Sequence, residues 1–441
     1  MYTQLIQSPV KCTQAIKTVS RSGLLLLLLV CAVSVQAMPP YRVTVKNNSG
    51  LNRIEELVIL KRAFLQKKIK ELSTKNFVLI KHHGQPLVVQ YDDLNNDGIW
   101  DEAVFLYTFK PFETVNFAVV VSDKPAAIKA VVKAHVRHKH KLNDNSFGEN
   151  VITDTMPYNN QPTDFTRQKL PPYLTEGPAW ENDKVGFRKY FDVRNANDLW
   201  GKTTDKMVMD FVGANPDSVY HHLSWWGMDI LKVGRSLGAG AIALRIPLKD
   251  RKKDTLLRLG NNTRKIIYHS LADGPVRAMF TITYSDCNVA AGIEPVTVVE
   301  KISIWGGQYF YKNEVEIKNA PNGAELVTGI PDFYNCSVDV VQKKSFALLY
   351  SFGRQSEHND TLTLAVMAPS KNFIKVNKAQ EEYSDISNAY LFHQSMESGI
   401  PVTYSFFSLW QLTDKHFTDK QKVRIFLEQQ ADLMQSPLSI K

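Results

Sequence analysis

One short segment, residues 176–192 (EGPAWENDKVGFRKYFD), combines the residue types most suited to chemistry. Read with a period of two, it predicts a strand that buries Phe187 and Phe191 on one face. The opposite face then carries Arg188 and Tyr190, and also Asn182 and Lys184. Cations hold carboxylates or sulfates, and a phenol can transfer a proton. The strand therefore predicts a face that binds an anionic group.

Two adjacent histidines, His221 and His222, supply a candidate base. The charge of an imidazole changes near neutral pH, which suits proton abstraction. Neighbouring residues of a strand face opposite sides, so we expect at most one of the two to reach the site. We assign His221 as the base and Tyr190 as the acid. An exchange of these roles and the use of His222 instead stay open.

Aromatic and charged residues near these groups predict a saccharide site. Aromatic rings form platforms for the apolar faces of sugars, and cations fix their acidic groups. The candidate substrate-binding residues are Trp180, Asn182, Lys184, Arg194, Trp225, Trp226, Asp229, Lys232 and Arg277. A glycosidase pair of carboxylates drawn from Glu176, Glu181 and Asp229 is the alternative, since the sequence leaves their separation open.

The loop DLNNDGIWDE, residues 93–102, places side-chain oxygens at alternate positions around a glycine. Short acidic loops that wrap Ca²⁺ have this layout, and the ligands here would be Asp93, Asn95, Asp97 and Asp101. Val104 stands where an EF-hand has its bidentate glutamate, so an Asx-rich hairpin turn stays open. Any calcium would be structural, and we expect no cofactor for catalysis.

A basic stretch, residues 124–150, separates two strand-rich regions. Its cations and histidines are His135, Arg137, His138, Lys139, His140 and Lys141. We interpret the stretch as a solvated connecting segment, with a metal site formed by the three histidines as the alternative.

The first 37 residues resemble a secretory signal. Three cations precede the apolar run Leu24–Val33, and Val35–Ala37 fits a small-residue cleavage site. This run is short for a bilayer span, and no later segment is longer, so we expect a periplasmic or secreted protein without a transmembrane segment in the mature chain. Lipid attachment at Cys31 is disfavoured, because Val30 stands where a small residue is usual.

The charge and cysteine content narrow the class of partner. The 441-residue chain has a formal net charge of +9, and loss of three cations with the signal leaves 50 Lys and Arg against 44 Asp and Glu, or +6. A modest positive excess favours anionic partners. The chain has no lysine-rich arm, so we expect an acidic oligosaccharide and no nucleic acid. Cys287 and Cys336 remain after cleavage, and free thiols are favoured over a disulfide.

Short alternating segments separated by turn residues predict an all-β fold. Residues 38–123 are expected to form a small N-terminal β-sandwich with a helix near Leu60–Leu72, and residues 151–441 a large antiparallel catalytic domain. A strand is also expected at Lys206–Val212. Asp419–Met434 is predicted to be a C-terminal helix, with a capping box of Thr418 and Gln421.

Four stretches resemble a domain-of-unknown-function family of secreted proteins from bacterial polysaccharide-utilisation systems, and the likeness covers nearly all of the mature chain. They are residues 94–106 (LNNDGIWDEAVFL), 176–202 (EGPAWENDKVGFRKYFDVRNANDLWGK), 220–244 (YHHLSWWGMDILKVGRSLGAGAIAL) and 274–278 (GPVRA). The resemblance implies a galactose-mutarotase-like supersandwich that acts on uronic-acid glycans. It also implies kinship with an oligosaccharide dehydratase acting on ulvan.

The residues and the resemblance both lead to β-elimination from a uronic acid. A cation or amide neutralises the C6 carboxylate, a base removes the C5 proton, and an acid protonates the oxygen leaving C4. The candidates for neutralisation are Arg188, Lys184, Asn182 and Arg277. A free C4 hydroxyl makes the reaction a dehydration, and a C4-linked sugar makes it a lyase reaction. A hydrolase using Asp229 and a glutamate, or a non-catalytic glycan-binding protein, is the alternative.

Overall fold

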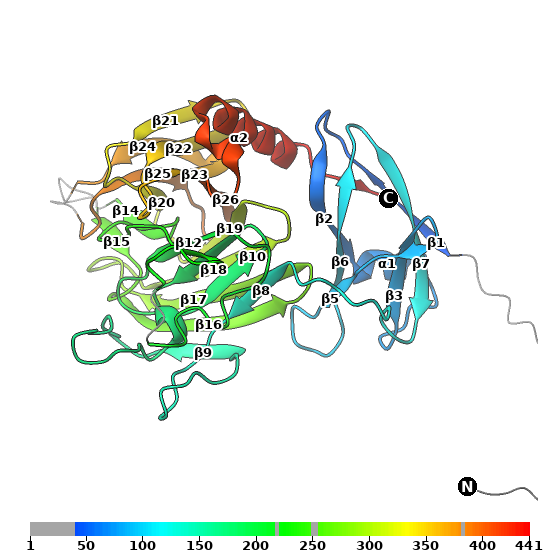
Figure 1. Ribbon diagram of the computed structural model, residues 1–441, viewed down its shortest axis with the longest axis horizontal. Coiled ribbons are helices and arrows are strands. Elements are labelled where there is room, and N and C mark those ends of the chain that lie inside the picture. Colours follow the sequence, from blue (N-terminus) through cyan, green and yellow to red (C-terminus); the bar gives the residue numbers. More distant parts are fainter. Residues whose placement is uncertain (1–39, 217–219, 248–254, 381–383) are drawn as a thin grey trace, which may run out of the picture. The chain divides into compact units, whose positions relative to one another are not determined.

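Strands dominate the protein in the computed structural model, which describes residues 40–216, 220–247, 255–380 and 384–441 (Figure 1). The predicted signal peptide and Cys31 lie outside these residues. Within them, no helix has the length and apolar character needed to cross a bilayer. Cys287 and Cys336 are free thiols.

The N-terminal region consists of two small antiparallel sheets that share one hydrophobic core. The first contains, in spatial order, β27 (Ser439–Ile440), β1 (Tyr41–Lys46), β7 (Thr114–Ser122), β3 (Phe77–His82) and β4 (Gln85–Pro86). The second contains β2 (Arg53–Lys61), β6 (Glu102–Phe109) and β5 (Gln90–Asp92). Alternating residues such as Val43, Phe105 and Phe117 point into the core between them.

Two details of this region differ from the predictions. Strand β2 occupies the first residues of the expected helix, and the helix itself, α1, is confined to Arg62–Lys68. The C-terminal strand β27 pairs with β1, so the last residues of the chain complete the N-terminal sheet. Pairing between strands nearly 400 residues apart leaves no local sequence pattern. The prediction therefore grouped the last residues with the large region, residues 151–441.

The large region is built on an antiparallel sheet of nine strands among the described residues. In spatial order these are β21 (Ser337–Gln342), β22 (Phe346–Arg354), β23 (Thr361–Pro369), β26 (Val402–Trp410), β19 (Phe310–Lys318), β18 (Val296–Trp305), β17 (Arg277–Cys287), β16 (Thr263–Asp273) and β9 (Thr153–Met156). Strand β18 alternates strictly between buried and half-buried residues, as expected for a sheet with one face on a core.

Two five-stranded antiparallel sheets share a hydrophobic core with this large sheet. One contains β15 (Thr255–Arg258), β14 (Ala243–Ile246), β20 (Glu325–Pro331), β25 (Ala389–Ser395) and β24 (Phe373–Lys378). The other contains β13 (Gly227–Asp229), β12 (Asn197–Lys202), β11 (Val185–Lys189), β10 (Ala179–Asn182) and β8 (Ala134–Arg137). Phe187, Leu326 and Phe280 represent the three sheets in the shared core. The predicted all-β antiparallel sandwich is confirmed.

The C-terminal helix α2 (Lys420–Gln435), red in Figure 1, packs its apolar stripe on β22. Val423 and Leu427 lie in this contact. The helix is confirmed, but its N-cap is Asp419, whose carboxylate accepts from the backbone N–H groups of the second and third helical residues. The predicted capping box is therefore wrong by one residue.

Short 3-10 turns are η1 (Leu174–Glu176), η2 (Ser370–Asn372) and η3 (Lys415–Thr418).

The basic stretch 124–150 is not a solvated linker throughout. Its middle forms β8, which pairs with β10. Arg137 at the end of β8 is fully buried and donates hydrogen bonds to the backbone carbonyls of Leu174, Gly177 and Met209. A guanidinium group with five donors can satisfy several buried carbonyls at once, so this cation has an interior structural role.

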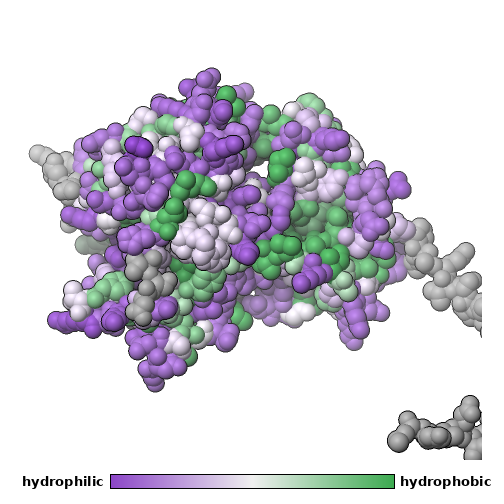
Figure 2. Space-filling view, in the orientation of Figure 1, coloured by the Kyte–Doolittle hydropathy of each residue, from purple (hydrophilic) through white to green (hydrophobic). Residues whose placement is uncertain are grey.

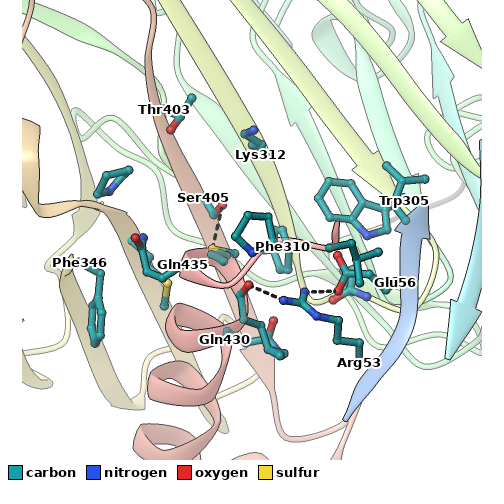
Figure 3. A pocket seen from close by; sticks show the side chains of 18 of the residues that line it. Arg53, Glu56, Trp305, Phe310, Lys312, Phe346, Thr403, Ser405, Gln430 and Gln435 are labelled. Atoms are coloured by element: carbon teal, nitrogen blue, oxygen red, sulfur yellow. Dashed lines mark hydrogen bonds and ion pairs between the residues drawn. The ribbon is translucent and has the colours of Figure 1, made fainter. Parts of the chain in front are cut away.

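A cavity of about 450 Å³ lies between β2, the large sheet and α2 (Figure 3). Apolar side chains such as Trp305 and Phe310 line much of it, and Arg53 at its edge bonds to Glu56 and to a carbonyl of α2. Most of the face in Figure 2 is hydrophilic, and hydrophobic residues gather where β2 and β6 lie. The predicted site residues are all outside the lining of this cavity.

Candidate active site

Three adjacent strands bring together a buried arginine and two aspartates. Arg188 of β11 lies opposite Asp198 of β12, and β13, which contains Asp229, pairs with the far side of β12. Nη2 of Arg188 donates to Oδ2 of Asp198 at 2.6 Å and to Oδ2 of Asp229 at 3.0 Å. All three residues are buried. Burying a charged group costs free energy unless the group is paired. The ion pairs of this network therefore offset the cost of burying the three side chains.

The face that contains Arg188 points away from the main core, as the alternation predicted, but it is buried rather than exposed. Phe187 lies in the main core. The residues around 206–212, predicted to be a strand, form turns instead. Val208 and Met209 of these turns donate their backbone N–H groups to the buried carboxylate of Glu181, and their side chains pack beside Trp200. This segment is part of the cover over the polar face.

A second arginine and two more carboxylates extend the network. Arg194 bonds to Glu176 at 2.5 Å and to Asp192 at 2.6 Å, and its guanidinium lies 3.8 Å from the ring centre of Tyr190. Glu176 also lies 3.7 Å from Arg188. Four carboxyl groups thus surround two guanidinium groups. Arg188 is already paired with Asp198 and Asp229, so this arrangement does not favour its predicted role as the group that neutralises a substrate carboxylate.

The backbone at η1 is strained in a way that positions Glu176. Thr175 and Glu176 have positive φ values of 49° and 66°, which are rare for residues with a side chain. Gly177 follows with φ of 153°, where a Cβ atom would lie 2.2 Å from the carbonyl oxygen of Lys189. The turn therefore requires this glycine. Strain of this kind persists only where surrounding contacts impose it, and here Arg137 bonds to the hydroxyl of Thr175.

His221 is the solvent-facing member of the cluster. Its side chain is 62% exposed, and Nδ1 lies 3.6 Å from Oδ2 of Asp229. Burial of part of the ring and the charge of Arg188 lower the pKa of His221. The neutral imidazole, which can accept a proton, is therefore favoured at neutral pH. His222 is also exposed, and the structure pairs His221 with the buried carboxylate.

The phenol beside His221 is Tyr220 rather than Tyr190. The rings of Tyr220 and His221 lie 4.5 Å apart, and the Tyr220 hydroxyl accepts from Arg188 at 3.2 Å. Tyr190 is buried and donates its hydroxyl to Asp198 at 2.6 Å. Burial, together with Asp198, raises the pKa of Tyr190 well above its usual value. The predicted acid role of Tyr190 stays a prediction that this arrangement does not favour, because the hydroxyl proton is held in a buried hydrogen bond to Asp198.

Most of the predicted aromatic platforms are core residues. Trp180 is fully buried and stacks on Phe187, and Trp226 is buried against Trp200. A sugar cannot reach either ring without unfolding the sheet. Trp225 is different, because it is 61% exposed and stacks on the exposed ring of Phe211 with an interplanar angle of 18°. Of the three predicted platforms, Trp225 alone is accessible to a sugar, and Phe211 was missed because it lies in the segment predicted as a strand.

The predicted cations and amide are scattered. Asn182 is buried and bonds to the carbonyls of Trp305 and Gln308, so it fixes a turn. Lys184 lies two residues further along, in the turn of the hairpin, and its Nζ is 3.8 Å from Oδ2 of Asp183.

Arg277 and Lys232 have different surroundings. Arg277 is buried and pairs with Asp92 and Glu102 of the N-terminal sheets, so its guanidinium group joins the two regions. Lys232 is exposed, and its ammonium group lies 5.2 Å from the ring centre of Phe333. Lys232 is therefore accessible to a ligand.

The acidic loop 93–102 has the hydrogen bonds of an Asx-rich turn. Asp93 accepts from the backbone N–H groups of Asp97 and Gly98, and Asp101 accepts from that of Leu94. Asn95 likewise accepts from Asp97. Within the described residues, the three side chains that converge as possible metal ligands are His138, His140 and Asp154, which lie outside this loop. Calcium binding by this loop stays a prediction.

The fold and the cluster define an all-β sandwich protein with a histidine and tyrosine above a buried arginine and carboxylate network. The chain belongs to the family described as "Domain of unknown function (DUF4861)", which matches residues 45–440. It is 22% identical to "Uncharacterized protein P7" of Formosa agariphila over 429 residues, covering 90% of this chain and 92% of that protein. Membership of a family of unknown function is therefore confirmed.

Two solved structures are also similar to this chain. An alpha-mannosidase from Enterococcus faecalis matches with 10% identity and a TM-score of 0.49, over 91% of this chain and 45% of that one. A glycosyl hydrolase family 38 protein from the same organism matches with 10% identity and a TM-score of 0.45, over 91% and 47%. The chain spans about half the length of each, and these likenesses do not bear on its activity.

Proposed function

We propose that the protein is a carbohydrate-active enzyme in which His221 is the general base. The single observation that carries this proposal is the placement of an exposed imidazole with Nδ1 toward the buried carboxylate of Asp229. A carboxyl group 3.6 Å from Nδ1 can orient the ring, which leaves Nε2 to accept a substrate proton. Arg188 holds Asp229 in place.

The proposed reaction is β-elimination from a uronic acid in an acidic oligosaccharide. His221 takes the C5 proton, the C–H electrons form the C4–C5 double bond, and the C4–O bond breaks. The departing oxygen takes a proton from Tyr220, whose hydroxyl accepts from Arg188. Lys232 replaces Arg188 as the proposed partner of the C6 carboxylate, because Lys232 is exposed while Arg188 is already paired.

A hydrolase is the second candidate, and one distance favours it. Asp198 and Asp229 bond to the same nitrogen of Arg188, so their Oδ2 atoms are at most about 5.6 Å apart, an upper limit that admits the roughly 5–5.5 Å spacing of retaining glycosidase carboxylates. However, both carboxylates are buried. A glycosidase pair must contact the scissile bond from both sides, so the elimination reaction is preferred.

Incubation with uronic-acid oligosaccharides separates these functions. We expect the unsaturated product to absorb in the ultraviolet, since elimination conjugates the new double bond with the carboxylate. Release of reducing ends without this chromophore would favour the hydrolase. Saturable binding with neither product would identify a glycan-binding protein, and a neutral mannan serves as the uncharged control substrate.

The pH profile tests the assignment of His221. Because burial and Arg188 lower the pKa of His221 below its ordinary value near 6.5, the neutral base should persist into mildly acidic solution. We expect kcat/KM to be level through neutral pH and to fall only as the pH drops through the lowered pKa. His222→Gln should keep the same profile. An acidic limb at or above the ordinary imidazole pKa would contradict the assignment.

Trp225 is expected to be a sugar platform. We predict that Trp225→Ala raises KM about tenfold, equivalent to ~1.4 kcal/mol, while kcat changes little, because the ring contributes to binding and not to proton transfer. Initial rates over a range of oligosaccharide concentrations give both constants. The matched variant is Trp226→Ala, which should lower the melting temperature instead because Trp226 is buried. An unchanged KM in Trp225→Ala would remove this residue from the site.

A further inference from the structure

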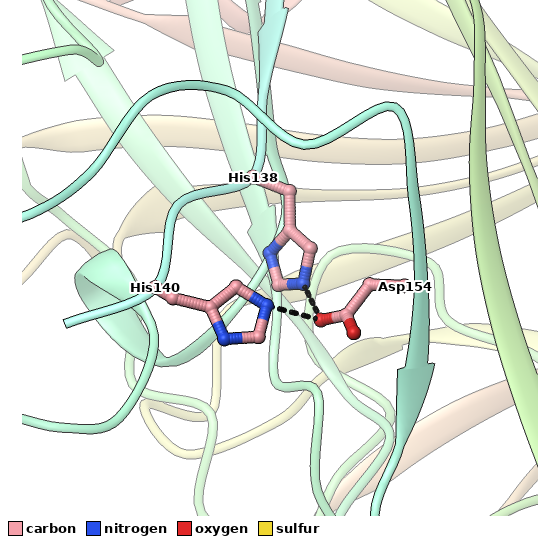
Figure 4. Close-up of side chains that lie close together, drawn as sticks. All are labelled: His138, His140 and Asp154. Carbon is pink, nitrogen blue, oxygen red and sulfur yellow. Dashed lines mark hydrogen bonds and ion pairs between the residues drawn. The ribbon is translucent and has the colours of Figure 1, made fainter. Parts of the chain in front are cut away.

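Two histidines and an aspartate converge outside the candidate active site (Figure 4). Nε2 of His138 lies 2.8 Å from Oδ2 of Asp154, and Nε2 of His140 lies 2.9 Å from the same oxygen. The ligand atoms of the three residues all lie within 4.8 Å of one another. The histidines come from the chain that follows β8, and Asp154 comes from β9, the edge strand of the large sheet.

The surrounding structure holds these groups in place. The buried His138 ring contacts the rings of Tyr173, Phe191 and Tyr268, each with centroids 5.0 Å apart. Oδ1 of Asp154 accepts from the N–H of Thr155, which leaves Oδ2 directed at both imidazoles. A site whose ligands are fixed before binding loses little conformational entropy when an ion arrives.

Solvent can still reach one side of the group. The side chain of His140 is 46% exposed and that of Asp154 is 15% exposed, whereas His138 is fully buried. An ion therefore has an entry path, and water can occupy further coordination positions. Two imidazole nitrogens and one carboxylate oxygen are a ligand set suited to Zn²⁺, while Ca²⁺ and Mg²⁺ prefer oxygen ligands alone.

We propose that His138, His140 and Asp154 bind a divalent transition-metal ion, Zn²⁺ in the first place, with water completing the coordination. Zinc bonds of about 2.0–2.2 Å in a tetrahedral site separate neighbouring ligand atoms by about 3.3–3.6 Å. The present nitrogen to oxygen distances of 2.8 and 2.9 Å must therefore open by about half an ångström. The partly exposed His140 and Asp154 allow this small adjustment.

The ion would have a structural role. It would join the segment after β8 to β9. This segment also contacts Tyr173 and Leu174, which lie just before Glu176 of the candidate active site. His140 pairs with Tyr173, and the carbonyl of Lys139 accepts from the N–H of Leu174, the first residue of η1. The same short turn contains Glu176. A bound ion should therefore stabilise the turn that places Glu176 beside the two arginines.

Metal binding is measured without any enzyme assay, so this proposal can fail or succeed independently of the proposed function. The mature chain, residues 38–441, is stripped with a chelator and titrated with Zn²⁺ against a chromophoric chelator, and the retained metal is counted by elemental analysis. We expect one equivalent of zinc and a higher melting temperature in its presence. Replacing a ligand should weaken binding at least 100-fold.

The variants are His140→Ala and Asp154→Asn. The first removes a half-exposed ring, and the second keeps the shape and an acceptor oxygen, so both are expected to fold, as circular dichroism checks. His416→Ala, at an exposed histidine in η3, is the matched control and should bind zinc like the unchanged protein. The proposal would be overturned if the protein bound less than a tenth of an equivalent of zinc. It would also be overturned if both ligand variants bound zinc with the same affinity as the unchanged protein. Preference for Ca²⁺ over Zn²⁺ would overturn it as well.

Discussion

Replacing His221 with glutamine is expected to lower kcat/KM by about 10² to 10⁴-fold. Glutamine keeps a polar side chain of similar reach, but it cannot accept a proton at neutral pH. Because the His221 side chain is 62% exposed, folding should change little. The measurement is the initial rate of chromophore formation from a uronic-acid oligosaccharide, with the melting temperature recorded on the same preparation.

The neighbouring histidine is the matched control for this result. His222→Gln makes the same chemical change one residue along the chain, without the contact to Asp229, and should retain most of the activity. If His222→Gln loses the activity and His221→Gln keeps it, then the base has been misassigned. If both variants keep it, the proton is removed by another group and the elimination mechanism built on His221 is wrong.

Replacing Arg188 with methionine is expected to destabilise the fold by about 3–5 kcal/mol, as removal of one member of a buried charge network usually does. Methionine fills similar space but leaves Asp198 and Asp229 buried without their shared donor. Burial would lower the pKa of Arg188, but the phenol and carboxylate groups around it raise its pKa, so the guanidinium is charged in the folded protein. Urea unfolding followed by tryptophan fluorescence gives the free energy.

Two further variants make this measurement specific. Arg188→Lys keeps one positive charge but loses the fork of donors, so it should fall between the unchanged protein and Arg188→Met. Arg424→Met removes an exposed cation of α2 that pairs with Glu428, and it should change the stability little. A loss in Arg188→Met no larger than that in Arg424→Met would show that the buried network is not a major source of stability.

The sequence by itself determined the local features of this protein. The strand β18 runs over Val296–Trp305, as its alternation predicts, and α2 follows from its apolar stripe. Arg188 and Phe187 were correctly placed on opposite faces of one strand, since Phe187 lies in the main core and Arg188 lies over the ring of Trp200 on the other side. These features depend on residues a few positions apart, where the periods of strands and helices are visible.

The sequence named Arg188, His221 and Asp229 as candidates, but it did not show that Asp198 joins the same ion-pair network. Asp198 lies ten residues after Arg188 and directly opposite it on the next strand. Asp198 and Trp200 are two residues apart on β12, so the period of a strand places both on one face. In the structure this is the face that points away from the main core. Tyr220 was visible beside His221, yet its preference over Tyr190 depends on which phenol is buried.

Only the tertiary structure decided which polar residues are covered. The turns at 206–212 cover part of the polar face of β11, and Arg277 pairs with Asp92, 185 residues away in the chain. Trp180 became a core residue and Trp225 an exposed one, although both are tryptophans in polar surroundings in the sequence. Burial and ion pairing depend on which distant segments pack together, and a local period contains no information about that choice.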